Sequence, residues 1–296
     1  MTSVQQGTLQ TPGASIFYRS CGRGPPVLIL AGGDADADAT DPLRDALAER
    51  HRVITYDRRG LSRSRPDPGA PTATIADHAQ DAHRLLAEMT DEPAFVFGSS
   101  IGGLIGLDLV ARHPSQVRLL VAHEAPTKEL LPEAEEAQMT AAQEAMRAAY
   151  AEAGISAALK KNAQLAGLDP EDREPDVTTL VPLTPQREAN LRVLLGDEAA
   201  QVMAYRLDLP AIDIEARRIA PAAGRSTRRT LLHRCARALS EVLERPLEEF
   251  PGGHTGWLLR PKAFAARLEE AFAEADRPRW LSGDAPGVAR RWTDDP

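Results

Sequence analysis

The chain has 296 residues, of which 43% are hydrophobic, and its formal net charge is −8. That length and apolar content suit one α/β domain carrying an insertion, and the negative charge argues against a nucleic-acid partner, because a polyphosphate needs a clustered positive surface. The sequence shows no signal segment and no apolar run approaching the roughly 18 residues of a membrane span, so we expect a cytoplasmic protein with no membrane partner.

Short apolar runs alternate with helical patterns along the first 125 residues. A polar strand at 14–19, expected at the edge of the sheet, comes first, and buried strands are expected at 27–31, 53–56, 94–97 and 119–122. Helices are expected at 75–89 and 101–112, the second ending before Pro114. This alternation predicts an α/β fold with a mostly parallel central sheet and helices on both faces.

The strand pattern is interrupted once and then returns. Residues 128–209 are rich in Ala, Glu and Leu and predict an inserted helical cap, with breaks near Gly154, 167–175 and 182–185. Weak strands are expected at 219–223 and 247–250, followed by a helix at 261–273. We therefore expect a core formed by residues 1–127 and 210–275, a cap at 128–209, and a flexible tail at 276–296.

A G-x-S-x-G motif lies between an expected strand and an expected helix. Its residues are Gly98, Ser100 and Gly102, and this strand-to-helix context is the one that a nucleophile elbow requires. The glycines allow close backbone approach, while the sharp turn projects Ser100 above the carboxyl edge of the sheet. Ser100 is therefore the candidate nucleophile, and a turn without chemistry is the alternative.

A serine nucleophile needs a base, and His254 is the candidate. It lies in the glycine-rich segment 250–256, after the last expected strand, where it can be placed over the sheet edge. The other six histidines are expected to be structural or solvated; their positions are His51, His78, His83, His113, His123 and His233.

Three segments together resemble the α/β-hydrolase superfamily, as a capped member with a serine nucleophile. Segment 30–33 resembles the oxyanion loop of that family, 56–64 its D-x-R-G-x-x-x-S turn, and 98–102 its nucleophile elbow. The resemblance implies that the backbone N–H groups of Gly33 and Ile101 form the oxyanion hole. Two departures are Ala31, where a histidine is usual, and Ser62, which replaces a common glycine of the turn.

The acid of the expected triad is missing from its usual place. The segment 216–240 contains no Asp or Glu, and Ser226 stands where the family usually has a carboxylate. Glu124, at the end of the strand after the elbow helix, is our candidate, because it could reach His254 from the same sheet edge. Asp213 and Glu215 are the alternatives, and Glu124 could instead cap the sheet edge or pair with an arginine.

With serine at the elbow we expect a metal-free and cofactor-free hydrolase that cleaves a small, mainly apolar ester or lactone through an acyl-enzyme. Carbon–carbon hydrolysis, a cyclase or lyase reaction, and a non-catalytic ligand-binding role remain alternatives, and a homo-oligomer stays open. The expected partner is a small-molecule substrate. Some apolar cap residues should line its pocket; the candidates are Leu130, Leu131, Met139, Met146, Leu159, Leu191, Leu194 and Met203.

Overall fold

The computed structural model describes residues 4–177 and 182–277, and the strands in these residues form one sheet. From β4 to β9 neighbouring strands are parallel, whereas β1, β2 and β5 pair antiparallel. The order across the sheet is β1 (Gln5–Thr11), β2 (Ala14–Cys21), β4 (Arg52–Tyr56), β3 (Pro26–Leu30), β6 (Ala94–Ser99), β7 (Val117–His123), β8 (Ile219–Gly224) and β9 (Glu248–Phe250), with β5 (Arg65–Pro66) beside β2. The expected mostly parallel sheet is confirmed.

The expected edge position of the first strand is wrong. Strand β2, which covers the predicted 14–19, has β1 on its outer side, paired from Gln5 with Ser20 to Thr11 with Ala14. Strand β1 is polar and largely exposed, so its sequence carries little apolar alternation to reveal it. An antiparallel hairpin at the edge can face water in this way.

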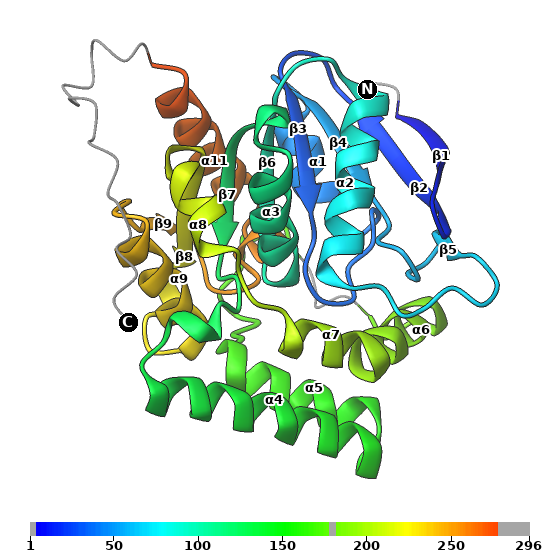
Figure 1. The fold of residues 1–296 in the computed structure, drawn as a ribbon, viewed down its shortest axis with the longest axis vertical. Helices are drawn as coiled ribbons and strands as arrows, with labels where there is room; N and C mark the ends of the chain where they lie inside the picture. The colour runs from blue at the N-terminus through cyan, green and yellow to red at the C-terminus, as the bar shows by residue number, and fades with distance from the viewer. Residues whose placement is uncertain (1–3, 178–181, 278–296) are drawn as a thin grey trace, which may run out of the picture.

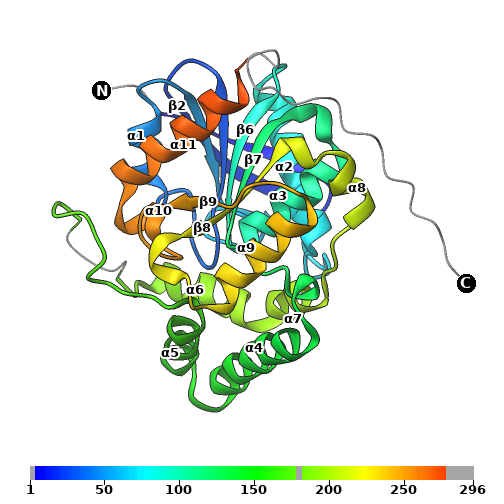
Figure 2. The same cartoon turned by 90° about the vertical axis from the view of Figure 1, so that its left-hand side faces the viewer.

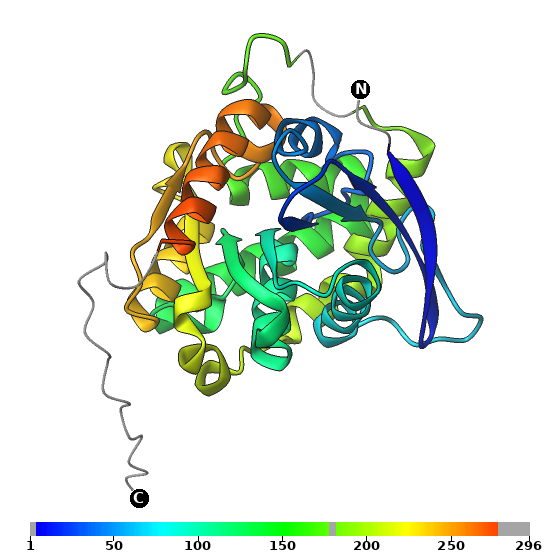
Figure 3. The same ribbon diagram turned by 90° about the horizontal axis from the view of Figure 1, so that it is seen from above.

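Helices cover both faces of the sheet, as Figures 1 and 3 show. One face packs against α2 (Ile75–Met89), α3 (Ile101–Arg112), α8 (Leu209–Ile214) and α9 (Leu231–Val242). The other packs against α1 (Asp41–Leu47), α10 (Gly256–Leu259) and α11 (Pro261–Ala275) (Figure 2). Each face has its own apolar cluster, so the sheet is the middle of three layers.

Helices α2 and α3 begin and end where the sequence predicts. Thr74 caps α2 by accepting from the Asp77 N–H, while the Asp77 carboxylate accepts from the Thr74 N–H, a reciprocal capping box. Helix α3 ends at Arg112, before His113 and Pro114. It is buried along nearly its whole length, which fixes its first residue against the sheet.

Between β7 and α8 the described residues form helices and no strand. These are α4 (Glu133–Ala153), α5 (Ile155–Ala166), α6 (Pro185–Val193), the π-helical turn η3 (Leu194–Glu198) and α7 (Ala199–Ala204). They lie together on one side of the core in Figure 1. Gly154 and Gly167, with φ values of 78° and 60°, end α4 and α5 as expected.

The short 3₁₀ turns η1 (Pro114–Gln116), η2 (Lys128–Leu130), η4 (Ala216–Arg218) and η5 (Arg225–Thr227) complete the described elements. The treatment of 128–209 as a separate cap stays a prediction, and most of the expected tail, residues 278–296, lies outside the described residues. Within the described residues, no helix has the length and apolar character needed to cross a membrane.

His123, the last residue of β7, is completely buried among aromatic rings. Its ring lies 5.4 Å from that of Phe264 and 6.0 Å from that of Phe250, measured between centroids. Neither ring nitrogen has a hydrogen-bond partner within the described part of the chain. Burial lowers the pKa of His123 to about 4, because the apolar surroundings disfavour the charged form.

This burial predicts an acid-sensitive fold. An unfolded histidine has a pKa of about 6.5, so between pH 6.5 and 4 the unfolded chain takes up a proton that folded His123 excludes, and stability falls as the pH falls. His123→Leu removes this difference. The free energy of unfolding, measured with urea at pH 7 and at pH 4, should fall less in the variant than in the unmodified protein. The difference between the two falls should be up to about 3 kcal/mol. An equal loss in both proteins would contradict the assignment.

Candidate active site

The sharp turn at Ser100 joins β6 to α3. Ser100 has φ 54° and ψ −120°, a left-handed conformation that is rare for a residue with a side chain, and α3 begins at the next residue. The Ser100 N–H donates to the His123 carbonyl at 2.9 Å, and the Ser100 carbonyl accepts from the Gly103 N–H at 2.8 Å. The expected elbow geometry is therefore present, held by backbone bonds on both sides.

Two glycines of the elbow are required by close backbone contacts. A Cβ atom on Gly98 would lie 2.4 Å from the Gly102 carbonyl oxygen, and one on Gly102 would lie 1.9 Å from the Leu30 carbonyl oxygen. Both distances are impossible for real atoms. Strand β3 thus passes directly under the first turn of α3.

The chain after β3 also passes the nucleophile. A Cβ atom on Gly32 would lie 2.9 Å from the Ser100 Cβ atom and 2.6 Å from the Ser99 carbonyl oxygen. Gly33 follows with φ 58°. Its carbonyl accepts a hydrogen bond from Arg58 Nη2. The expected oxyanion loop therefore lies beside Ser100, and both Gly33 and Ile101 line the same cavity as that serine.

His254 lies against Glu124. His254 Nδ1 and Glu124 Oε2 are 2.7 Å apart. The histidine follows β9 in the loop 251–255, whereas Glu124 directly follows β7 and has φ 46°. The histidine side chain is 12% exposed and that of the glutamate 0%. The two candidates that the sequence placed on different strand ends are thus brought together.

The Glu124 carboxylate has further donors besides His254. Its Oε1 accepts from the N–H of Gly224, the last residue of β8, at 3.0 Å and from the hydroxyl of Thr227, in the η5 turn that follows. Burial by itself raises the pKa of Glu124, but the hydrogen bond with His254, the nearby histidine charges and the Thr227 bond outweigh it and lower the pKa to about 2. The carboxylate is therefore ionised at neutral pH and held in one orientation.

The alternative acids are placed elsewhere. Asp213 is exposed, and Glu215 pairs with Arg218 at 2.8 Å. Ser226, at the usual acid position, donates to Asp172 at 2.5 Å and does not supply a substitute for the carboxylate. The contact of Thr227 with Glu124 was not predicted, because Thr227 lies in the Arg-rich run 225–229, whose sequence gives no sign of a buried contact.

A cavity of about 1550 Å³ opens over these residues. Ser100 and His254 both line it, and no other histidine within residues 4–177 and 182–277 does. Six of the eight proposed apolar wall residues line it, namely Met139, Met146, Leu159, Leu191, Leu194 and Met203. Leu130 and Leu131 instead pack into apolar clusters. The inserted helices thus form a wall of the cavity that contains the candidate nucleophile.

Three of the other histidines pack against neighbouring side chains. The rings of His83 and His113 stack with centroids 3.6 Å apart, each bonded to a glutamine side chain, and the ring of His51 packs against Phe95 and Phe272. No group of three or more His, Cys, Asp or Glu side chains in the described ranges could hold a metal ion.

Comparisons with known proteins agree with this architecture. The chain is 38% identical to an uncharacterized hydrolase, YraK, from Bacillus subtilis over 273 residues, which cover 90% of this chain and 96% of the relative. It is 40% identical to a putative carbamate hydrolase, RutD, from Azorhizobium caulinodans over 107 residues, 36% of this chain and 40% of the relative.

Among solved structures, a thermophilic esterase from Thermogutta terrifontis has a similar fold, with a TM-score of 0.66 and 17% identity over 92% of this chain and 100% of the esterase. At that identity the likeness shows the fold alone. A family model described as the alpha/beta hydrolase fold matches residues 25–190, more than half of the sequence. The chain therefore belongs to the α/β-hydrolase-fold family.

Proposed function

We propose that this protein is a serine hydrolase that cleaves a mainly apolar ester or lactone through an acyl-enzyme. The observation that carries the proposal is the 2.7 Å contact between His254 Nδ1 and the buried Glu124 carboxylate, beside a cavity that Ser100 also lines. A histidine oriented by a carboxylate is the arrangement that activates a serine hydroxyl.

In the proposed mechanism the Ser100 hydroxyl attacks the substrate carbonyl and His254 Nε2 takes its proton. The N–H groups of Gly33 and Ile101 donate to the oxyanion that forms. His254 then returns the proton to the leaving alcohol, leaving the acyl group on Ser100. Water attacks this ester while His254 accepts its proton, and His254 then returns the proton to Ser100 Oγ as the acid is released. Glu124 keeps the Nδ1–H tautomer in place and stabilises the imidazolium.

The cavity walls support an apolar substrate. The wall formed by the inserted helices includes three methionines and several leucines. Methionine side chains adapt to varied apolar shapes. The volume of about 1550 Å³ exceeds the roughly 300–1,000 Å³ of a typical ligand pocket, so the acyl chain need not be short. A series of p-nitrophenyl esters from acetate to octanoate measures this preference directly.

A carbamate is the second candidate substrate, favoured by the similarity to RutD from Azorhizobium caulinodans. The same serine would carry a carbamoyl group in place of the acyl group. Comparing kcat/KM for matched esters and carbamates separates the two. A protein that binds such compounds without cleaving either would instead have the non-catalytic role.

Ser100→Ala should abolish turnover and labelling by a fluorophosphonate probe, since Ser100 is the residue at the sharp turn between β6 and α3 and its hydroxyl would carry the acyl group. The thermal midpoint should stay unchanged or rise, because a residue kept for function is seldom the most stable choice at its position. Ser99→Ala, which changes the adjacent serine, is the matched control and should keep labelling. Near-normal turnover in Ser100→Ala would refute the nucleophile assignment.

Glu124→Gln should lower kcat/KM by a factor approaching ~10⁴, because an amide at this position can stabilise the wrong histidine tautomer. Glu215→Gln, the corresponding change at the alternative acid, should leave kcat/KM within about twofold. Initial rates on the best p-nitrophenyl ester provide the measurement. A loss below tenfold in Glu124→Gln would mean that this carboxylate is structural.

A further inference from the structure

Ser62 occupies a backbone conformation that favours glycine. Its φ is 47°, in the turn between β4 and α2, at the position where the sequence departs from a common glycine of the related family. A residue with a side chain is strained at such an angle, whereas glycine is not. A serine at this position must therefore make side-chain contacts, which glycine lacks, that offset the strain.

The Ser62 side chain makes two such contacts. Its hydroxyl donates to Asp36 Oδ2 at 2.6 Å and accepts from Asn190 Nδ2 at 3.0 Å. The Ser62 N–H also donates to Asn190 Oδ1 at 2.9 Å. Asn190 lies on α6 and is 2% exposed, so this amide joins the inserted helices to the turn after β4 inside the protein.

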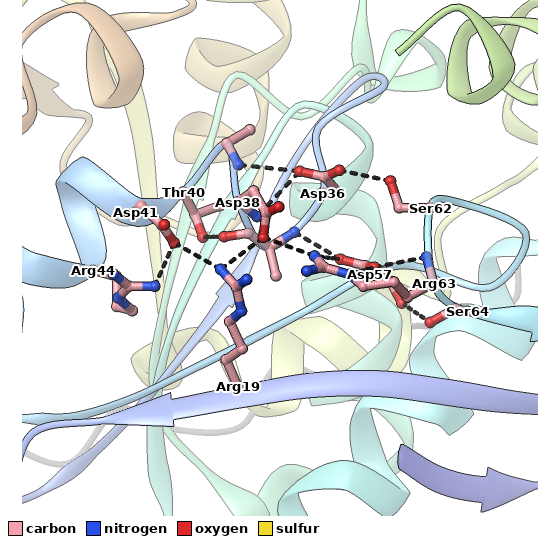
Figure 4. Close-up of polar contacts among 12 residues, drawn as sticks. Arg19, Asp36, Asp38, Thr40, Asp41, Arg44, Asp57, Ser62, Arg63 and Ser64 are labelled. Atoms are coloured by element: carbon pink, nitrogen blue, oxygen red, sulfur yellow. Dashed lines mark hydrogen bonds and ion pairs between the residues drawn. The ribbon is translucent and has the colours of Figure 1, made fainter. Parts of the chain in front are cut away.

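Asp36, in turn, organises the segment that follows Gly33. Its Oδ1 accepts from the N–H groups of Asp38 and Ala39, each at 3.1 Å, while its Oδ2 accepts from Ser62. Figure 4 shows Ser62 pointing at Asp36 across this loop, beside a second carboxylate, Asp57. The Asp57 carboxylate accepts from the Ala37 N–H at 2.9 Å.

The inserted helix also contacts the residue next to Gly33. Asn190 Nδ2 donates to the Asp34 carbonyl at 3.1 Å, and Arg187 Nε, on the same helix, lies 2.7 Å from Asp34 Oδ2. Since Asp34 follows Gly33 directly, these bonds limit the movement of the chain next to the proposed oxyanion donor, the Gly33 N–H. The cavity wall and the oxyanion loop are thus one hydrogen-bonded unit.

We propose that Ser62 and Asn190 are positioning residues, which hold segment 33–39 so that the Gly33 N–H stays directed at the oxyanion. This inference rests on the proposed function. Glycine at position 62 would allow the turn after β4 without strain. The serine side chain is therefore not needed for the turn itself, and its contacts hold segment 33–39. Its loss should act on the transition state, where the oxyanion forms, more than on substrate binding.

Ser62→Gly separates positioning from folding, because it removes the side-chain contacts and relieves the φ strain together, while the N–H that donates to Asn190 is kept. We expect the thermal midpoint to stay unchanged or rise and KM to change by less than about threefold. We expect kcat to fall about tenfold, which is less than the ~10²–10³-fold fall that follows removal of a complete oxyanion-hole donor. Phosphonate labelling should slow similarly. Ser62→Asn, which tolerates positive φ and carries a donor, should recover most of the loss.

The matched control is Glu244→Gly, on an exposed residue with φ 50° after α9, which should leave kcat unchanged. Asn190→Ala should lower kcat to a similar degree. Ser62→Gly combined with Asn190→Ala should add little further loss, because both act through one network. The proposal would be overturned if the fall in kcat of the double variant equalled the product of the two single falls, or if kcat were unchanged in Ser62→Gly.

Amide hydrogen exchange of segment 33–39 tests the loop without depending on turnover. Faster exchange in Ser62→Gly than in the unmodified protein supports the positioning role, and equal exchange overturns it. If the unmodified protein neither turns over esters nor reacts with the phosphonate, the proposed function fails. The exchange result then still decides whether Ser62 holds the loop.

Discussion

The buried carboxylate of Glu124 is the constraint on which the site depends. A charge removed from water costs several kcal/mol unless it is paired and hydrogen-bonded. Here the donors are Gly224 at the end of β8, Thr227 in the turn after it, and His254 in the loop after β9. Satisfying one carboxylate therefore fixes three strand ends relative to each other and places the histidine ring at the cavity.

The elements that the sequence predicts best are those with strong local signals. Helices α2 and α3 combine apolar faces with a capping box or a following proline, and the buried strands are continuous apolar runs. Strand β1 was not predicted, because its seven residues include three glutamines and only one large apolar side chain. Its position depends on pairing with β2, which is a tertiary effect.

For the site, Ser100 and His254 follow from motif and position, and Glu124 from the absence of a carboxylate in 216–240. The contacts of Thr227 and Asn190 could not be predicted. Each joins residues about a hundred or more positions apart in the chain, 103 for Thr227 with Glu124 and 128 for Asn190 with Ser62. The substitution of a common glycine by Ser62 was the one local sign that this turn makes unusual contacts.

In the proposed function Ser100, His254, Glu124 and two backbone amides act on one reacting centre. A crystal structure of the protein after reaction with an alkyl phosphonate tests it most directly. Phosphorus should be bonded to Ser100 Oγ, a phosphonyl oxygen should lie within about 2.7–3.1 Å of the Gly33 and Ile101 nitrogens, and the His254–Glu124 contact should be retained. An adduct on another residue, or an oxygen directed away from both amides, would contradict it.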